Sequence, residues 1–185
     1  MTINQKRITL KNLKVADFAS EETLCFTAIV LFDGEPVADA SNDGHGGMTF
    51  VRSRDGKQSK LSEAERFAAS LPEVVTDYDD PLDSSRKFTI QITLDYLVDD
   101  IANTMHADKK IRAAFNRDIG NKVLFVKDGK LLFLKGAKLK TVTDRPAYFA
   151  RLRAAQKQPI VILAELAPDE AFALWKKYTG NDVAS

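Results

Sequence analysis

Residues 23–34, which read TLCFTAIVLFDG, decide the fold of this chain. From residue 26 onward both alternate positions are apolar, and this pattern predicts a strand that is covered on both faces. Asp33-Gly34 is typical of a tight β-turn, so we expect the chain to reverse there into a second strand. Pro36 has no amide hydrogen to donate to a ladder, which predicts that the returning strand lies at a sheet edge or begins just after this residue.

The sequence on either side extends this hairpin into an antiparallel meander. Residues 8–15 begin with alternating apolar positions, and a change of phase near Asn12 indicates a bulge or a bend. Residues 48–52 are expected to add a further short strand after a glycine-rich loop. The N-terminal part, to about Arg52, is therefore predicted to be a β meander.

The next segment changes from β to helical patterning. Ser62 and Glu65 fit a capping box, in which each side chain satisfies a free amide of the other, so we expect a short helix over residues 63–70. Residues 76–87 are rich in Asp and Ser, and they predict an exposed loop.

A longer helical pattern follows over residues 94–105, with apolar residues on one side and aspartates on the other. It continues in a second helix, or beyond a kink near His106, and Gly120 is a natural stop. Two apolar runs on either side of Asp128-Gly129 then predict a second β-hairpin.

The C-terminal part alternates between helix and strand. Residues 143–156 are expected to form a helix with Thr143 as its cap, and residues 160–163 a buried strand. Pro168 starts the last helix. The fold class is therefore α+β, an N-terminal antiparallel β meander followed by a mixed helix/hairpin half. We expect one domain over residues 1–185, or two halves, 1–60 and 61–185.

Composition excludes several protein classes. The chain has 185 residues with 44% hydrophobic and 29% charged, which is ordinary for a globular protein and argues against general disorder. A single cysteine, Cys25, excludes an internal disulfide framework. Neither a signal peptide nor an apolar segment of about 20 residues is visible in the sequence. We therefore expect a cytoplasmic protein without membrane association.

The loop at residues 42–47 is the first candidate site, because three of its six residues are glycines that let the backbone approach a ligand. Successive amides in such a turn can form an anion-binding nest. Asp43 and His45 could transfer protons or contact a metal. The alternative is an irregular turn with an exposed histidine. The candidate ligand-binding residues of this loop are Asn42, Asp43, Gly44, His45, Gly46 and Gly47.

The sequence resembles a family of small uncharacterised proteins of phages and bacterial genomes in three segments: SEETLCF at 20–26, Asp33-Gly34, and SNDGHGG at 41–47. Residues 163–175 are similar to that family in style. The resemblance implies an accessory role in a phage or mobile element and a shared fold along most of the chain, and it assigns no catalytic residue. The family often carries a cysteine after the glycine pair, where this chain has Met48. This departure puts in doubt any role that needs a thiol there.

Other residues give weak signals for metal binding or catalysis. His45 and His106 are far apart in sequence, and no Cys or His spacing is typical of a zinc site. Asp95 and Asp99, one helical turn apart, could hold a hard cation, although a solvated helix face explains them as well. Cys25 is expected to be an inert core thiol. We therefore predict no metal and no cofactor.

Charge is distributed unevenly along the chain. Residues 109–157 contain fourteen Lys and Arg and only three Asp and Glu. Residues 63–100 contain three Lys and Arg and ten Asp and Glu. Lys138, Lys140 and Arg145 are the secondary candidates for ligand binding, because such a basic region can hold phosphate groups. The alternative is that the acidic segment lies against the basic one.

Three functional hypotheses follow. The first is a non-enzymatic accessory protein that binds a host macromolecule or a small phosphorylated ligand in the host cytoplasm, with antagonism of host defence as one route. The second is a phosphoester hydrolase that uses Asp43 and His45. The third is a nucleic-acid-binding protein that uses residues 109–157, whose affinity should fall steeply with salt.

Overall fold

The computed structural model describes residues 3–179, and the chain divides into two compact units, 1–107 and 108–185. The expected α+β class is confirmed, with a four-stranded antiparallel meander first and helices with small sheets after it. The division falls at residue 107 rather than at residue 60, because the meander shares its hydrophobic core with helices as far as Ala102.

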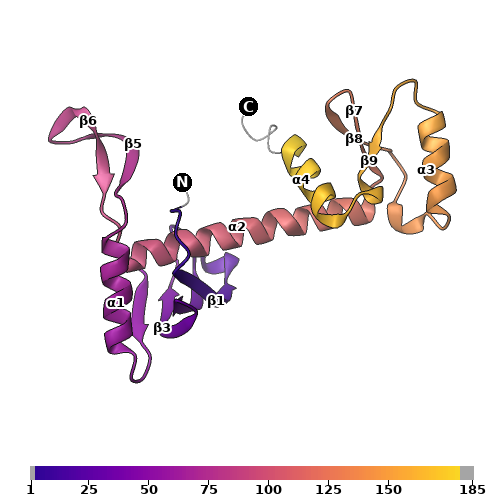
Figure 1. Cartoon of the computed structure of the whole chain (residues 1–185). Helices are drawn as coiled ribbons and strands as arrows, with labels where there is room; N and C mark the ends of the chain where they lie inside the picture. Colours follow the sequence, from indigo (N-terminus) through magenta and orange to yellow (C-terminus); the bar gives the residue numbers. More distant parts are fainter. Residues whose placement is uncertain (1–2, 180–185) are drawn as a thin grey trace. The chain divides into compact units, whose positions relative to one another are not determined.

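The sheet of the first unit has strand order β1-β2-β3-β4, and every neighbouring pair is antiparallel. Its strands are β1 (Ile8–Val15), β2 (Phe26–Phe32), β3 (Glu35–Asn42) and β4 (Phe50–Ser53). Figure 1 shows these strands in indigo and purple beside helix α2 (Leu94–Asn121). The meander predicted from the sequence is therefore present.

The local backbone features follow the sequence closely. Asp33 and Gly34 have φ angles of 51° and 83°, so both central residues of the β2–β3 turn take the left-handed conformation that two-residue hairpins favour. Asn12 has a φ of 55°, and the pairing of β1 with β2 shifts between Lys11 and Lys14. The bulge expected near Asn12 is confirmed.

Neither alternative predicted from Pro36 is correct, because β3 begins before this residue, at Glu35, and is not an edge strand. β3 lies between β2 and β4. Pro36 is opposite Leu31, where the β2–β3 register shifts between Val30 and Leu31. Because a bulge interrupts the regular ladder, a residue without an amide hydrogen can be placed there inside a sheet.

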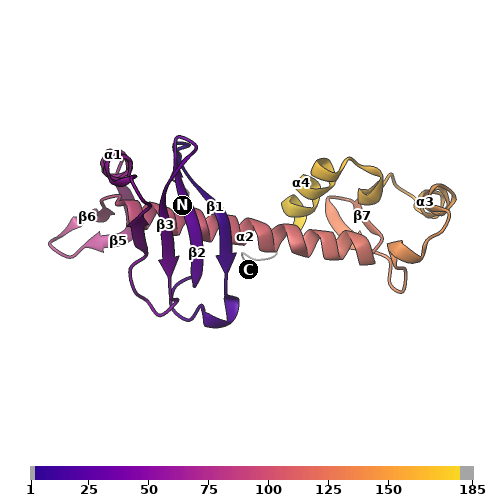
Figure 2. The same ribbon diagram turned by 90° about the horizontal axis from the view of Figure 1, so that it is seen from below.

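Only one face of this sheet is covered, which corrects the expectation that β2 is buried on both sides. Helices α1 (Gln58–Ala69) and α2 contribute to the core on the covered face, where Val30, Val37 and Leu97 are fully buried. On the opposite face Thr27 is exposed, and Ile29 is only half-buried. Figure 2 shows the strands in front of α2, with no helix of the first unit on the nearer side.

Helix α1 starts five residues before the predicted start at residue 63, and its N-cap residue, Lys57, makes no side-chain capping bond. The capping box was therefore wrong, since Ser62 and Glu65 lie inside the helix. Its buried residues are Leu61, Ala64 and Ala68, so the first turn is needed to bring Leu61 to the core.

The acidic segment predicted as a loop is a hairpin, β5 (Val74–Asp80) and β6 (Asp83–Ile90). It is exposed over most of its length, as expected, and extends away from the β1–β4 sheet (Figure 1). Helix α2 continues through His106 without a break, so the kink and the second helix are not formed. Exposed charged residues of good helix propensity connect its two apolar parts.

The second unit contains a small sheet of order β8-β7-β9. The predicted Asp128-Gly129 hairpin is confirmed and joins the first two strands, but the expected strand at 160–163 is short. Asp144 rather than Thr143 caps α3, because its carboxylate accepts the amide hydrogen of Ala147 at 3.0 Å. The elements are β7 (Leu124–Lys127), β8 (Lys130–Phe133), α3 (Arg145–Ala154), β9 (Val161–Ile162) and α4 (Pro168–Thr179).

Two hydrophobic clusters stabilise the second unit. One joins α3 to the sheet through Phe149 and Leu152, and the other joins the end of α2 to α4 through Phe115 and Trp175. The rings of Phe115 and Trp175 meet edge to face with centroids 5.7 Å apart. Over residues 3–179, no helix combines the length and the apolar character that a bilayer span requires.

Candidate functional site

The glycine loop after β3 is organised by the side chain of Asn42, which is 3% exposed. Its Oδ1 accepts hydrogen bonds from Thr23 Oγ1 at 2.8 Å and from the amide of Gly44 at 2.9 Å. Its Nδ2 donates to the carbonyl of Gly47 at 3.0 Å and to Thr49 Oγ1 at 3.1 Å. Asn42 therefore uses its full hydrogen-bonding capacity to hold the loop and does not face a ligand.

Gly44 fixes the loop against the segment that precedes β2. Its carbonyl oxygen accepts hydrogen bonds from the successive amides of residues 21–23, at 3.0, 2.9 and 3.2 Å. Its φ is 91°, and a Cβ at this position would lie 2.0 Å from the carbonyl oxygen of Ala19. Only glycine fits here, and the reason is internal packing rather than the approach of a ligand.

The anion-binding nest expected in this loop is not formed. The amide of Gly44 donates to Asn42, that of His45 to Asp43 Oδ1 at 3.3 Å, and that of Gly46 to Thr23 Oγ1 at 3.3 Å. A nest needs successive amides that point toward a common anion. Side chains of the protein already accept these three.

His45 and Asp43 do not form the catalytic pair that the sequence suggested. Asp43 accepts a hydrogen bond from the backbone of His45, whereas the imidazole Nδ1 lies 3.3 Å from Glu21 Oε2. Both members of the His45–Glu21 pair are well exposed. Among residues 3–179 no three His, Cys, Asp or Glu side chains are grouped so that they could hold a metal ion.

The other isolated candidates have structural contacts. Asp99 Oδ1 accepts a hydrogen bond of 2.5 Å from Thr49 Oγ1, which ties α2 to the glycine loop. Burial raises the pKa of Asp99, and the Thr49 bond opposes this rise. His106 Nε2 lies 2.9 Å from Asp17 Oδ1. Cys25 is half-buried and lies beside Gly44.

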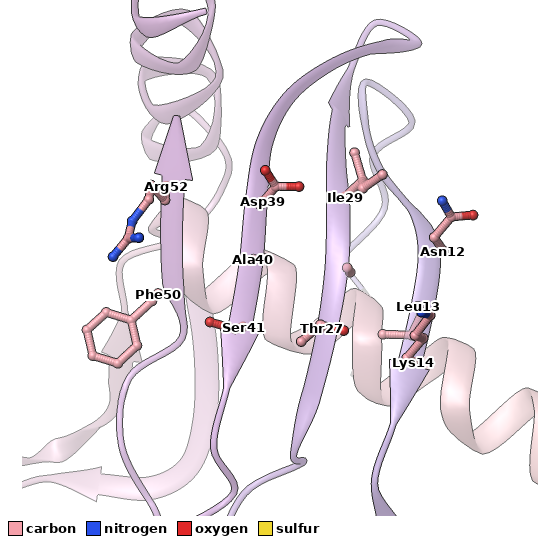
Figure 3. A pocket seen from close by; sticks show the side chains of 11 residues that line it. Asn12, Leu13, Lys14, Thr27, Ile29, Asp39, Ala40, Ser41, Phe50 and Arg52 are labelled. Atoms are coloured by element: carbon pink, nitrogen blue, oxygen red, sulfur yellow. The ribbon is translucent and has the colours of Figure 1, made fainter. Parts of the chain in front are cut away.

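The uncovered side of the β1–β4 sheet is a second candidate surface, and the sequence did not indicate it. Two rows of cross-strand neighbours form it, and we call these eight residues the open sheet face. The first row is Lys11, Ile29, Asp39 and Arg52, and the second is Lys14, Thr27, Ser41 and Phe50. Figure 3 looks onto this face, with α2 behind the sheet.

Short side chains in the middle of the open sheet face leave a hollow of about 830 Å³. Thr27 and Ser41 line its floor, and Phe50, which is 71% exposed, lies at one side. The carboxylate of Asp39 is 3.6 Å from Arg54 Nε, so its charge is balanced by a neighbour. Within residues 3–179 the side chains of Lys11, Lys14 and Arg52 make no hydrogen bond or ion pair.

The secondary candidates Lys138, Lys140 and Arg145 lie in the second unit, near the start of α3. A hollow of about 350 Å³ is lined by Lys138 and Arg151, with Asp144 and Tyr148 between them. We call the exposed cations of this region the basic cluster. Its members are Lys135, Lys138, Lys140, Arg145 and Arg151.

No side chain of the basic cluster makes a hydrogen bond or an ion pair in the part of the chain that the structure describes. Three other cations of the unit have acidic partners. Arg112 lies 3.3 Å from Asp169, and Lys122 lies 2.9 Å from Asp118. Arg153 pairs with Glu165. The acidic partners in these three pairs lie away from the basic cluster, whereas Asp144 lies beside it and caps α3.

The open sheet face was missed because β2 was interpreted as a strand buried on both sides. The sequence signal for an open face was the presence of charged residues at alternate positions of the strands on either side of β2 and β3. Lys11 in β1 and Arg52 in β4 are charged residues at ladder positions that share one face with Ile29. A strand whose outward neighbours are charged has one solvent-exposed face.

Comparison with models of protein families, with curated proteins and with solved structures finds no match for this chain. The surfaces described above are therefore the basis for inferring function.

Proposed function

We propose that this protein binds nucleic acid through the basic cluster, which corresponds to the third hypothesis from the sequence. The observation that carries the proposal is that five exposed cations lie between residues 135 and 151 without an internal partner in residues 3–179, and that two of them, Lys138 and Arg151, line one hollow. Phosphates of nucleic acid are the polyanionic partner that such a cluster recognises.

The free energy of binding would come mainly from release of counterions. Each phosphate neutralised by Lys or Arg lowers the slope of log K against log salt by roughly 0.9 for a duplex and 0.7 for a single strand. Cations already held in ion pairs contribute less, because they must exchange a protein carboxylate for a phosphate. The five members of the basic cluster do not have this cost.

The geometry of the glycine loop supports the other two hypotheses less well. Its amides are used internally, which removes the means by which it would hold a phosphorylated ligand. A hydrolase that uses Asp43 and His45 would need the two side chains to act together, and Asp43 instead closes its own turn. The resemblance to phage proteins is compatible with a partner that is host or phage nucleic acid.

The test is fluorescence anisotropy of the full chain with labelled duplex and single-stranded oligonucleotides at salt concentrations between about 50 and 200 mM. A triple variant, Lys138→Glu with Lys140→Glu and Arg145→Glu, should weaken binding at low salt at least about tenfold and make the salt slope shallower. Lys176→Glu, an exposed lysine of α4, is the control for a charge change elsewhere in the unit.

Two results would overturn the proposal. One is the absence of binding to every oligonucleotide at low salt. The other is an equal loss of affinity in Lys140→Glu and Lys176→Glu, which would mean that net charge acts rather than the basic cluster.

A further inference from the structure

We infer that the open sheet face binds single-stranded nucleic acid, with a base stacked on Phe50 and phosphates held by Lys11, Lys14 and Arg52. This inference extends the proposed function to a second surface, in the first unit, and its observations are independent of the basic cluster. It also specifies which form of nucleic acid the first unit prefers.

Phe50 has the position that a stacking residue needs. It is the first residue of β4, at the outer strand of the sheet, and its ring is largely exposed beside Ser41. The neighbouring Ser41 and Thr27 are short, so a planar group can lie over the sheet next to the ring without a clash. Stacking on an aromatic side chain accepts any base, because every base offers a π-face.

The charge of this face differs from that of the unit around it. Residues 1–107 hold eleven Lys and Arg against eighteen Asp and Glu, so the unit is acidic overall. The open sheet face has the opposite balance, since Asp39 is its only acidic member and is paired with Arg54. Cations are therefore more frequent on this face than in the unit as a whole.

Lys14 and Arg52 line the hollow from opposite sides, and Lys11 lies in the ladder row next to it, opposite Ile29. Lys11 and Lys14 belong to β1, and Arg52 belongs to β4. Three strand spacings separate β1 from β4, so the cations of the two strands are about 14 Å apart across the sheet. A nucleic-acid strand that crosses the sheet would thus meet a cation at each edge and the aromatic ring at one of them.

The geometry favours a single strand over a duplex. In a duplex the bases are stacked on one another and paired, so none presents a free face to Phe50. In a single strand an unstacked base can reach the ring while the adjacent phosphates contact the cations. The duplex could use the cations but not the ring.

The test compares Phe50→Ala with Phe50→Tyr and with Phe18→Ala in the full chain. Phe18 is 94% exposed and lies outside the open sheet face, so it controls for the loss of an exposed phenyl ring. Phe50→Ala should weaken binding to single-stranded DNA or RNA by about tenfold, while Phe50→Tyr and Phe18→Ala retain it. Affinity for a duplex should be the same in all three variants. Equal-length DNA and RNA strands distinguish the two sources of the single strand.

Cross-linking locates the contact directly. Single strands that carry 5-iodouracil should cross-link to the peptide that contains Phe50 on irradiation, and this product should persist in the triple variant of the basic cluster.

If single strands bind but Phe50→Ala keeps full affinity and the cross-links map only to residues 109–157, the open sheet face is not the site, and the proposed function stands. If single-strand binding depends on Phe50 and is unaffected by the triple variant, the proposed function fails and this inference stands. Failure of every oligonucleotide to bind would overturn both, and would leave the face to a protein partner.

Discussion

At the residue scale, a short polar chain connects the glycine loop to helix α2. Asn42 Nδ2 donates to Thr49 Oγ1, which in turn donates to Asp99 Oδ1. Thr49 and Asn42 are buried, so this row of hydrogen bonds ends at an Asp99 carboxylate that is partly shielded from solvent. Burial at this position raises the pKa of Asp99, the hydrogen bond from Thr49 opposes the rise, and the nearby charge of Asp95 adds to it.

This raised pKa predicts a stability effect with a definite sign. A carboxyl whose pKa is higher in the folded than in the unfolded chain contributes stability below its ordinary pKa, and this contribution is lost as the pH rises through the folded value. Asp99→Asn retains an acceptor for Thr49 and removes the charge. We expect the variant to gain stability relative to the wild type between about pH 4 and pH 7, on the order of 1 kcal/mol or less.

Urea unfolding of both proteins across this pH range measures the difference. Asp55→Asn, an exposed residue of the same unit, removes an equal charge and should show no such gain. A relative stability of Asp99→Asn that stays constant or falls with rising pH would contradict the prediction. Arg7 lowers the pKa of Asp33, and Lys57 lowers that of Glu35. These two carboxylates therefore make the folded state more stable as the pH rises, but they do so equally in both proteins, and their contribution cancels in the comparison.

At the element scale, the sequence predicted what depends on neighbours along the chain. Both Asp-Gly turns and the bulge at Asn12 are correct, because a positive φ angle is a local requirement. The start of α1 and the hairpin β5–β6 were missed. Helix α1 starts earlier than predicted because Leu61, in its first turn, packs in the core formed by residues distant in sequence. Residues 74–90 form strands because their backbone groups pair with each other across the hairpin, and composition does not indicate this pairing.

The β5–β6 hairpin is expected to be the first site of proteolysis. Its strands pair with each other alone among residues 3–179, and Arg86 and Lys87 are exposed in β6. Two strands without a further partner open at little cost, so a protease gains access there before it reaches the four-stranded sheet.

Limited digestion with trypsin, followed by mass spectrometry, should therefore show the first cut after Arg86 or Lys87. The double variant Arg86→Gln with Lys87→Gln should delay the first cut, and the loss of their ion pairs with Asp79, Asp80 and Asp83 should change stability only slightly, because solvent screens exposed pairs. An initial cut after Arg52, in β4, or after Arg54, which follows it, would show that the sheet opens more readily than the hairpin.

At the scale of the whole molecule, the sequence predicted the uneven charge but not its use. The basic segment at 109–157 is clear from composition, but only the structure distinguishes Arg112 and Lys122, which have acidic partners, from the basic cluster, which has none in the described residues. The open sheet face shows the same limit. Its residues come from four strands, and their common orientation depends on the register of the ladder.

The separate cores predict that the two units unfold independently. The cluster around Leu97 belongs to residues 1–107, and those around Phe149 and Phe115 belong to residues 108–185. Trp175 is the single tryptophan and is buried in the second unit, so its fluorescence reports that unit alone. Leu97→Ala removes a fully buried side chain and should destabilise the first unit by roughly 2–5 kcal/mol. In urea titrations the circular dichroism transition should then shift to lower urea while the fluorescence transition stays in place. Phe149→Ala, in the second unit, is the matched variant and should shift the fluorescence transition.

If Leu97→Ala moves both transitions equally, the two units fold as one cooperative structure, and α2 couples them more strongly than their separate cores indicate.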